Sequence, residues 1–205
     1  MKTAYIFCKS FDLNENKINI GEGLYIAADS GLETAKKLNV EPSVIIGDFD
    51  SVDLDLAAEY NKLEHPPEKD DTDSMLCIKY ALNLGYSDIV IVGGIGGRID
   101  HTLVNLAALK YIANRGGIGV ITDGLNKIRY LKNGSMRVHK NYKYISIIPI
   151  SRELSGLTLK GFVYDTNNAS VQSDEVYTVS NEILGDFGDI TIASGEAFIC
   201  ECDNQ

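Results

Sequence analysis

Residues 43–51 read Ser43-Val-Ile-Ile-Gly-Asp-Phe-Asp-Ser51, a run of strand-forming residues that leads into a glycine and then into two carboxylates. Asp48 and Asp50 stand two apart, and side chains two apart in extended backbone project from the same face. Because neighbouring carboxylates repel each other, the pair predicts a hard cation between them, with Mg²⁺ the leading candidate. The alternative is an acidic turn in which Asp48 and Asp50 cap nearby backbone N–H groups.

The sequence on both sides of this stretch alternates between strand and helix patterns as far as about residue 122. Strand patterns cover residues 3–7, 24–28, 44–46, 89–92 and 118–121, and helix patterns cover residues 31–38, 54–60, 72–84 and 101–113. Such alternation is typical of βαβ units, in which helices cover a mainly parallel sheet. We therefore predict a three-layer α/β domain over residues 1–124.

The helical pattern stops near Asp123, and the rest of the chain has a different texture. Clusters of Gly, Asn, Ser and Asp separate short strand patterns at residues 128–131, 136–138, 144–148, 157–159, 175–179, 189–192 and 197–202. This arrangement is typical of an antiparallel β-sandwich. We predict a smaller domain of that kind over residues 125–205.

Composition narrows the classes of partner. The 205 residues are 44% hydrophobic and 23% charged, which is ordinary for a globular protein. The net charge of −10 argues against a nucleic-acid partner, because phosphate contacts need a basic face. No apolar run approaches the roughly 18 residues of a membrane span, and the N-terminus has no signal-peptide layout. The four cysteines match no zinc or redox spacing. We expect a cytoplasmic protein with no membrane partner.

The polar clusters of the first half follow its strand patterns. Asp29 comes after residues 24–28, Asp48 and Asp50 come after residues 44–46, and a glycine-rich stretch comes after residues 89–92. Ligands of open α/β sheets bind beyond the carboxyl ends of the strands. These clusters therefore predict one ligand site at that edge of the sheet.

The glycine-rich stretch is Gly93-Gly-Ile-Gly-Gly-Arg-Ile-Asp-His101. Its glycines let the backbone approach a ligand closely and aim N–H groups at phosphate oxygens, and Arg98 adds a planar fork suited to phosphate. The stretch is neither a P-loop nor a complete dinucleotide fingerprint, because residue 99 is Ile. Asp100 and His101 could instead cap the next helix, and we expect His101 to be structural or peripheral rather than catalytic.

A third acidic cluster, Lys69-Asp-Asp-Thr-Asp73, precedes the helix pattern that begins near Thr72. Taken alone, Asp70 reads as a helix cap, because Asp is a preferred cap and an acidic first turn suits the helix dipole.

Three motifs in this order resemble those of the thiamin pyrophosphokinase (thiamin diphosphokinase) family. They are Gly47-Asp-Phe-Asp-Ser51, the cluster at residues 69–73 and the stretch at residues 93–101, with Ala28-Asp-Ser-Gly31 upstream. The likeness extends to Ser155-Gly-Leu157 and Val179-Ser-Asn-Glu182, which resemble the thiamin-binding β-domain of that family. The resemblance implies transfer of a pyrophosphoryl group from ATP to the hydroxyl of thiamin, giving thiamin diphosphate and AMP, on a homodimer that shares its active sites between subunits.

The resemblance also implies roles for individual residues. Asp48, Asp50 and Asp70 would hold Mg²⁺ and, with Arg98 and Asp100, form the catalytic set. Residues placed at ATP are Asp29, Ser30, Gly47, Ser51, Asp73, Gly93, Gly94, Gly96, Gly97, Arg98 and His101. Asp100, Ser180 and Asn181 would contact thiamin, the last two from the partner subunit. Some members stack thiamin on a tryptophan, and this chain has none, so any stacking must use Tyr or Phe.

Two other functions fit the motifs. One is a pyrophosphokinase acting on another hydroxymethyl heterocycle, such as a reduced pterin, because only the β-domain and the dimer site would differ. The other is a thiamin or nucleotide sensor without turnover, which loss of a metal carboxylate would favour, and none is missing. No strong general base is visible, and a loose phosphoryl-transfer transition state needs little early proton removal.

Overall fold

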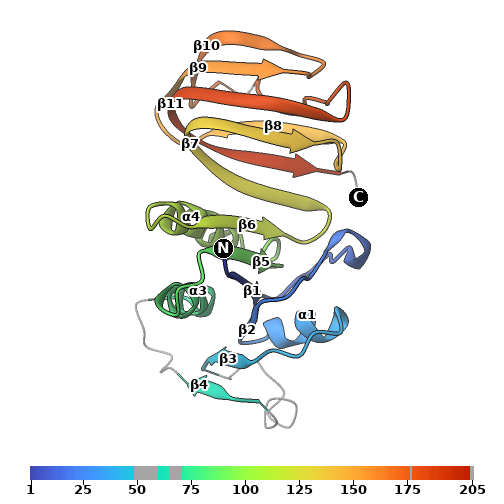
Figure 1. Cartoon of the computed structure of the whole chain (residues 1–205), viewed down its shortest axis with the longest axis vertical. Helices are drawn as coiled ribbons and strands as arrows, with labels where there is room; N and C mark the ends of the chain where they lie inside the picture. The colour runs from blue at the N-terminus through green and yellow to red at the C-terminus, as the bar shows by residue number, and fades with distance from the viewer. Residues whose placement is uncertain (49–59, 65–70, 176, 204–205) are drawn as a thin grey trace. The chain divides into compact units, whose positions relative to one another are not determined.

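The computed structural model describes residues 1–48, 60–64, 71–175 and 177–203, and the chain divides into two units, Met1–Gly124 and Leu125–Gln205 (Figure 1). Each unit has its own buried core, described below. Within the described residues, no helix is both long and apolar enough to cross a membrane.

The first unit is built on a parallel sheet, as the alternating pattern predicts. Its described strands are β1 (Thr3–Phe7), β2 (Leu24–Ala28), β3 (Val44–Gly47), β4 (Lys62–Glu64), β5 (Asp88–Val92) and β6 (Ile118–Thr122). They lie in the order β6-β5-β1-β2-β3-β4, and each neighbouring pair is parallel. The jump from β1 to β5 places the middle of the sheet between the two halves of the βαβ winding, where ligand crevices form.

Three α-helices of the described part pack against this sheet: α1 (Gly31–Lys37), α3 (Asp73–Asn83) and α4 (Ile99–Ala113). A short 3-10 helix, η1 (Glu15–Lys17), lies in the β1–β2 connection. The fully buried side chains that join helices to strands are Ile6, Phe7, Ile26, Ile45, Ile46, Ile89 and Ile91 from the sheet and Leu32, Ile78, Leu109 and Ile112 from the helices. Burying each such side chain contributes about 1.5–3 kcal/mol, so this core holds the carboxyl ends of the strands in place.

Two features of the first unit differ from the sequence pattern or fall outside what the structure describes. Strand β4 was not predicted, because two of its three residues are charged and the segment is too short to show alternation. The helix predicted over residues 54–60 lies outside the described residues, apart from Tyr60, which lies in a bend.

The second unit consists of antiparallel strands. They are β7 (Asn126–His139), β8 (Tyr144–Pro149), β9 (Glu153–Lys160), β10 (Thr166–Gln172) and β11 (Phe187–Cys202). The first part of β11 pairs with β9, the second part pairs with β8, and β7 pairs along both. The core between them is aliphatic, with Phe162 as its fully buried aromatic side chain among the described residues.

The strands of this unit differ from the predicted ones in four places. The patterns at residues 128–131 and 136–138 are one strand, β7, and those at residues 189–192 and 197–202 are one strand, β11, because a single register shift in their pairing spans both apparent breaks. The strand predicted at residues 175–179 is wrong, since none of the described residues there, 175 and 177–179, lies in a strand. Strand β10 was missed because its sequence, Thr-Asn-Asn-Ala-Ser-Val-Gln, is mostly polar.

Candidate active site

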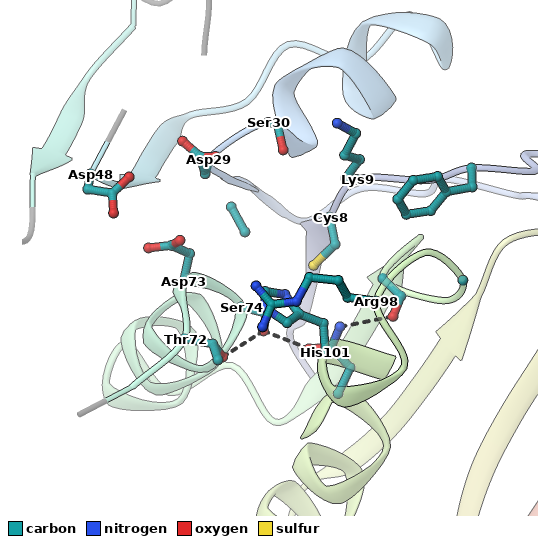
Figure 2. A pocket seen from close by; sticks show the side chains of 15 residues that line it. Cys8, Lys9, Asp29, Ser30, Asp48, Thr72, Asp73, Ser74, Arg98 and His101 are labelled. Atoms are coloured by element: carbon teal, nitrogen blue, oxygen red, sulfur yellow. Dashed lines mark hydrogen bonds between the residues drawn. The ribbon is translucent and has the colours of Figure 1, made fainter. Parts of the chain in front are cut away.

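A cavity of about 650 Å³ opens at the carboxyl edge of the parallel sheet, where the strand-end clusters predicted a ligand site (Figure 2). Most of its lining residues follow β1, β2, β3 and β5 or lie at the start of α3 and α4, while Ala28 ends β2 and Asn105 lies within α4. They are Cys8, Lys9, Phe11, Ala28, Asp29, Ser30, Asp48, Thr72, Asp73, Ser74, Gly94, Gly96, Arg98, His101 and Asn105. All belong to the first unit.

Three carboxylates line one part of this cavity: Asp29, Asp48 and Asp73. Asp29 has a φ of 47°, a conformation that costs energy for a residue with a side chain, and its N–H donates to the carbonyl of Ile46 at 3.0 Å. A Cβ on Gly47 would lie 3.0 Å from the Cβ of Asp29, which explains the glycine that precedes Asp48. Asp73 stands in the first turn of α3, where a negative charge suits the helix dipole.

The predicted metal ligands are only partly covered by the structure. Asp50, Ser51 and Asp70 lie outside the described residues. Among the residues described, no three His, Cys, Asp or Glu side chains lie close enough together to hold a metal ion. The donor chemistry of the cavity nevertheless fits Mg²⁺, because Asp29, Asp48 and Asp73 all present carboxylate oxygens to it.

The structure identifies the residue that caps the N-terminus of α3. Thr72 occupies that position, and its Oγ1 accepts a hydrogen bond from the N–H of Met75 at 3.3 Å. The described N-cap of this helix is thus Thr72, and Asp70, for which the sequence suggested a cap, lies outside the described residues.

A chain of polar contacts joins α3, α4 and the glycine-rich stretch. Thr72 Oγ1 lies 3.0 Å from Ser74 Oγ, which donates to Asn105 Oδ1 at 2.7 Å, and Asn105 Nδ2 donates to the carbonyl of Gly94 at 2.9 Å. Ser74 and Asn105 are buried. Sequence reasoning missed both, although a Ser and an Asn on the apolar faces of predicted helices are the signal that such a network gives.

The glycines at 93, 94, 96 and 97 all have left-handed φ values, from 63° to 89°, which other residues adopt only with strain. A Cβ on Gly97 would lie 2.3 Å from the ring of Phe11. The N–H groups of Gly93, Gly94 and Gly96 donate to Thr122, Lys9 and Thr102 respectively. For these three glycines the expectation that N–H groups point at a ligand is therefore wrong, and their conformation serves the tight packing of the loop.

Arg98 and Asp100 form a two-pronged ion pair. Arg98 Nε and Nη2 donate to Asp100 Oδ1 and Oδ2 at 3.1 and 2.6 Å, and the N–H of His101 donates to Asp100 Oδ1 at 2.9 Å. The guanidinium of Arg98, followed by the His101 N–H, lowers the pKa of Asp100, so this carboxylate stays ionised at neutral pH. Both side chains are more than half exposed, and a pair in water exchanges partners at little cost.

Cys8 is also part of the cavity wall but is not a nucleophile. Burial, followed by the nearby charge of Asp73, raises the pKa of its thiol to about 12. The thiol therefore stays protonated at neutral pH, and a protonated thiol is unreactive.

The two residues predicted for thiamin in the second unit differ in their surroundings. Ser180 is exposed, with a φ of 56° and an N–H that donates to Ser146 Oγ at 3.0 Å. Asn181 is 5% exposed; its Oδ1 accepts the N–H groups of Tyr164 and Glu182, and its Nδ2 donates to the carbonyl of Tyr164 at 2.9 Å. Asn181 thus fixes the backbone of Tyr164, whose side chain is 70% exposed.

Fold and site together define an α/β protein with an acidic and glycine-lined cavity at the carboxyl edge of a parallel sheet, followed by an all-β unit. Residues 17–120 match the family model described as thiamin pyrophosphokinase, catalytic domain, and residues 133–198 match the one described as thiamin pyrophosphokinase, vitamin B1 binding domain. The chain belongs to the thiamin pyrophosphokinase family.

Individual relatives agree with this assignment. The chain is 33% identical over 180 residues to thiamine pyrophosphokinase of Bacillus subtilis, covering 84% of each protein. The crystal structure of a thiamine pyrophosphokinase from Bacillus subtilis superposes with a TM-score of 0.90 at 27% identity, covering both chains fully. A thiamin pyrophosphokinase from Geobacillus thermodenitrificans gives a TM-score of 0.85 at 25% identity over 99% of this chain and 98% of that one.

Proposed function

We propose that this protein is a thiamin pyrophosphokinase, which transfers the pyrophosphoryl group of ATP to the hydroxyl of thiamin and releases AMP. The observation that carries the proposal is the match of both units, in order, to the catalytic and the vitamin B1 binding models of one family. The free thiols of its four cysteines suit the cytoplasmic location expected from the sequence.

The cavity of the first unit suits Mg²⁺ and ATP. We assign Mg²⁺ to Asp48, with Asp50 and Asp70 as predicted from the sequence and Asp29 and Asp73 beside them. When bound, Mg²⁺ would neutralise charge on the phosphate oxygens. Phosphoryl transfer depends mainly on positioning and charge stabilisation, so the protein's part is to hold the β-phosphorus in line with the acceptor oxygen. The guanidinium of Arg98 would leave Asp100 and bind phosphate oxygens instead, because an ion pair between two exposed side chains costs little to break.

Asp100 suits the thiamin cation rather than proton transfer. Its lowered pKa keeps it ionised, which makes it a weak base and a favourable neighbour for a positively charged ring. Once Arg98 engages phosphate, the freed carboxylate can face the thiazolium ring.

Tyr164 is our candidate for the aromatic surface that contacts thiamin in place of tryptophan. Its backbone is clamped on both sides by Asn181, and its side chain is 70% exposed, so the ring is free to stack on a flat ligand. In this role Asn181 acts through Tyr164, and Ser180 next to it remains a direct contact.

A homodimer with shared sites is part of the proposal. Exposed apolar side chains lie next to both sets of predicted thiamin residues: Ile99 and Leu103 beside Asp100, and Val163 beside Tyr164. Contiguous exposed apolar patches mark surfaces that other chains cover, and these side chains are our candidates for such a patch.

The direct test is incubation of the protein with ATP, Mg²⁺ and thiamin, followed by separation of the nucleotides. We expect equal amounts of AMP and thiamin diphosphate, and no ADP. A reduced hydroxymethylpterin as acceptor serves as the control, because the same reaction on that substrate would identify the rival pyrophosphokinase. Tight binding of thiamin without any AMP would indicate a sensor instead.

A further inference from the structure

Lys9 lies at the same edge of the sheet as the predicted ATP residues, although no motif marks it. It follows β1 in the middle of the parallel sheet, its side chain is exposed, and it lines the cavity. The N–H of Cys8 donates to the carbonyl of Val92 at 2.8 Å, so the backbone leading to Lys9 continues the pairing of β1 with β5.

The backbone of Lys9 is fixed to the glycine-rich stretch. Its carbonyl accepts the N–H of Gly94 at 2.9 Å, and two residues later the ring of Phe11 packs against Gly97. The ammonium lies 5.9 Å from the centre of that ring, a favourable cation–π distance. The side chain of Lys9 therefore extends into the cavity from a backbone that is held by hydrogen bonds to neighbouring segments.

Charge is divided across the cavity. Figure 2 shows Asp29, Asp48 and Asp73 on one side of the view and Lys9 and Arg98 on the other. Among the described residues, no carboxylate forms an ion pair with Lys9, whereas Arg98 is held by Asp100. A ligand that carries a metal ion on one side and bare phosphate oxygens on the other would match both sides.

We propose that Lys9 binds the phosphates of ATP and is the cation that captures them in the absence of thiamin. This inference rests on the proposed function only in taking ATP as the ligand. A lysine is a compact charge on a flexible stem, which suits polyphosphate binding without the planar geometry that Arg98 imposes.

The test is calorimetric binding of Mg²⁺ and α,β-methylene-ATP, whose α–β bridge resists cleavage, without thiamin. Lys9→Gln should weaken binding at least about tenfold, or about 1.4 kcal/mol, and Lys9→Arg should stay within about threefold of the native protein. Adenosine, which lacks phosphates, should bind both proteins equally. The matched control is Lys2→Gln, because Lys2 is an exposed lysine that precedes β1 at its opposite end and contacts Tyr86 instead.

Each outcome decides the inference. Unchanged analogue binding by Lys9→Gln, or an equal loss for adenosine and the analogue, would overturn it, because neither result fits a phosphate contact. Kinetics give a second reading: Lys9→Gln should raise KM for ATP about tenfold with kcat changed less than about threefold. If native protein binds the analogue through Lys9 but makes no AMP, the proposed function fails and the phosphate site stands.

Discussion

At the scale of single residues, the strongest predicted effect on activity is that of replacing a carboxylate at the sheet edge. Asp48→Asn should lower kcat/KM at least 100-fold, roughly 3 kcal/mol of transition-state stabilisation, because a neutral amide is a poor Mg²⁺ ligand. The melting temperature without metal should not fall, since the change relieves repulsion among carboxylates in the cavity. Steady-state kinetics and a thermal melt of the same preparation measure both.

A matched control for this variant is Asp174→Asn, an exposed turn residue in the second unit. It should leave both activity and melting temperature unchanged. Near-native turnover by Asp48→Asn would refute the metal assignment.

Asn181 and Ser180 are neighbours with opposite predicted responses. Asn181→Ala would leave the N–H groups of Tyr164 and Glu182 and the carbonyl of Tyr164 without their partner, so we expect a loss of about 1–3 kcal/mol in the free energy of unfolding. Ser180→Gly should be neutral or slightly stabilising, because glycine accepts the φ of 56° without strain. Denaturant unfolding separates the two, and KM for thiamin should rise for Ser180→Gly. Equal stability of the two variants would argue against the clamp.

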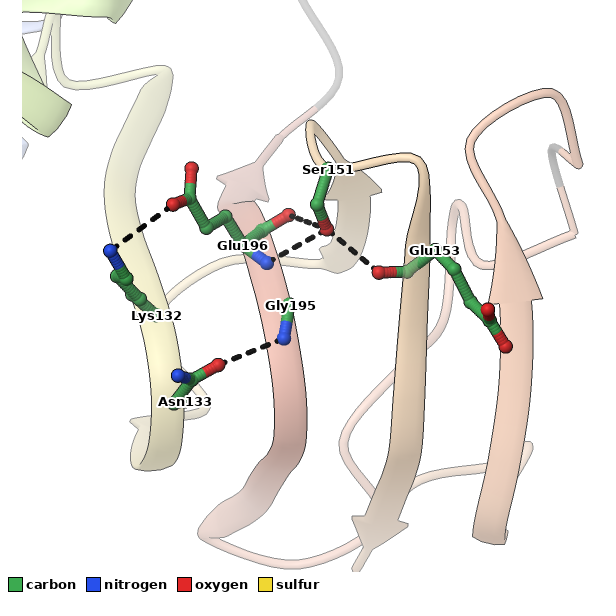
Figure 3. Close-up of polar contacts among 6 residues, drawn as sticks. All are labelled: Lys132, Asn133, Ser151, Glu153, Gly195 and Glu196. Carbon is green, nitrogen blue, oxygen red and sulfur yellow. Dashed lines mark hydrogen bonds and ion pairs between the residues drawn. The ribbon is translucent and has the colours of Figure 1, made fainter.

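At the scale of elements, strand β11 continues as one strand through a local break in its hydrophobic pattern (Figure 3). Gly195 has a φ of 121°, and a Cβ there would lie 2.7 Å from the carbonyl of Glu153. Its N–H donates to Asn133 Oδ1 at 2.8 Å, while Ser151 Oγ accepts the N–H of Glu196 at 3.0 Å and donates to the carbonyl of Glu153 at 2.7 Å. These contacts replace the missing ladder bonds, so the strand continues through a bulge.

At the start of α3, substitutions can distinguish a residue that caps the helix from a residue that binds the metal ion. Thr72→Ala removes the acceptor for the N–H of Met75 and should cost about 1 kcal/mol of stability, whereas Thr72→Ser keeps the hydroxyl and most of the stability. Asp70→Asn should keep the melting temperature yet lose activity, because Thr72 provides the N-cap and Asn is a poorer metal ligand than Asp. A drop in melting temperature for Asp70→Asn with full specific activity would reverse this assignment.

At the scale of the whole molecule, the proposed dimer predicts rescue between two inactive proteins. Asp48→Asn damages the first unit and Tyr164→Ala damages the second, so a mixed dimer that shares its sites contains one site built from two intact halves. We expect activity to return to about one native site per mixed dimer. Tyr164→Ala is preferred to Asn181→Ala, because the Tyr164 side chain is exposed and its removal leaves the hydrogen bonds of Asn181 in place.

Differently tagged chains, purified in tandem, verify that mixed dimers have formed before activity is measured. Verified mixed dimers without rescue would place the thiamin site within a single chain. Inactive homodimers of each variant are the necessary baseline.

The sequence by itself determined the α/β class, the antiparallel second unit and the edge of the sheet at which the cavity opens. The period of hydrophobic residues and the residue types in turns indicate local structure and burial, and both can be read directly from the sequence. The polar residues that follow strand ends, as in Ala28-Asp29 and Gly47-Asp48, are likewise adjacent to their strands in the chain. The sequence around Gly195, by contrast, predicts a turn. The side chains that accept hydrogen bonds from the N–H groups of Gly195 and Glu196 belong to Asn133 and Ser151, which are 62 and 45 residues away in the chain.

Only the tertiary structure decided which polar groups meet. The Ser74–Asn105–Gly94 chain, the cation of Lys9 beside the glycine-rich stretch and the clamp of Asn181 on Tyr164 join residues that are distant in sequence or carry no motif. A hydrogen bond depends on the distance and angle between two atoms, and packing of the whole unit sets both. The residue types at these positions are visible in the sequence, but their partners exist only once the sheet and helices have packed.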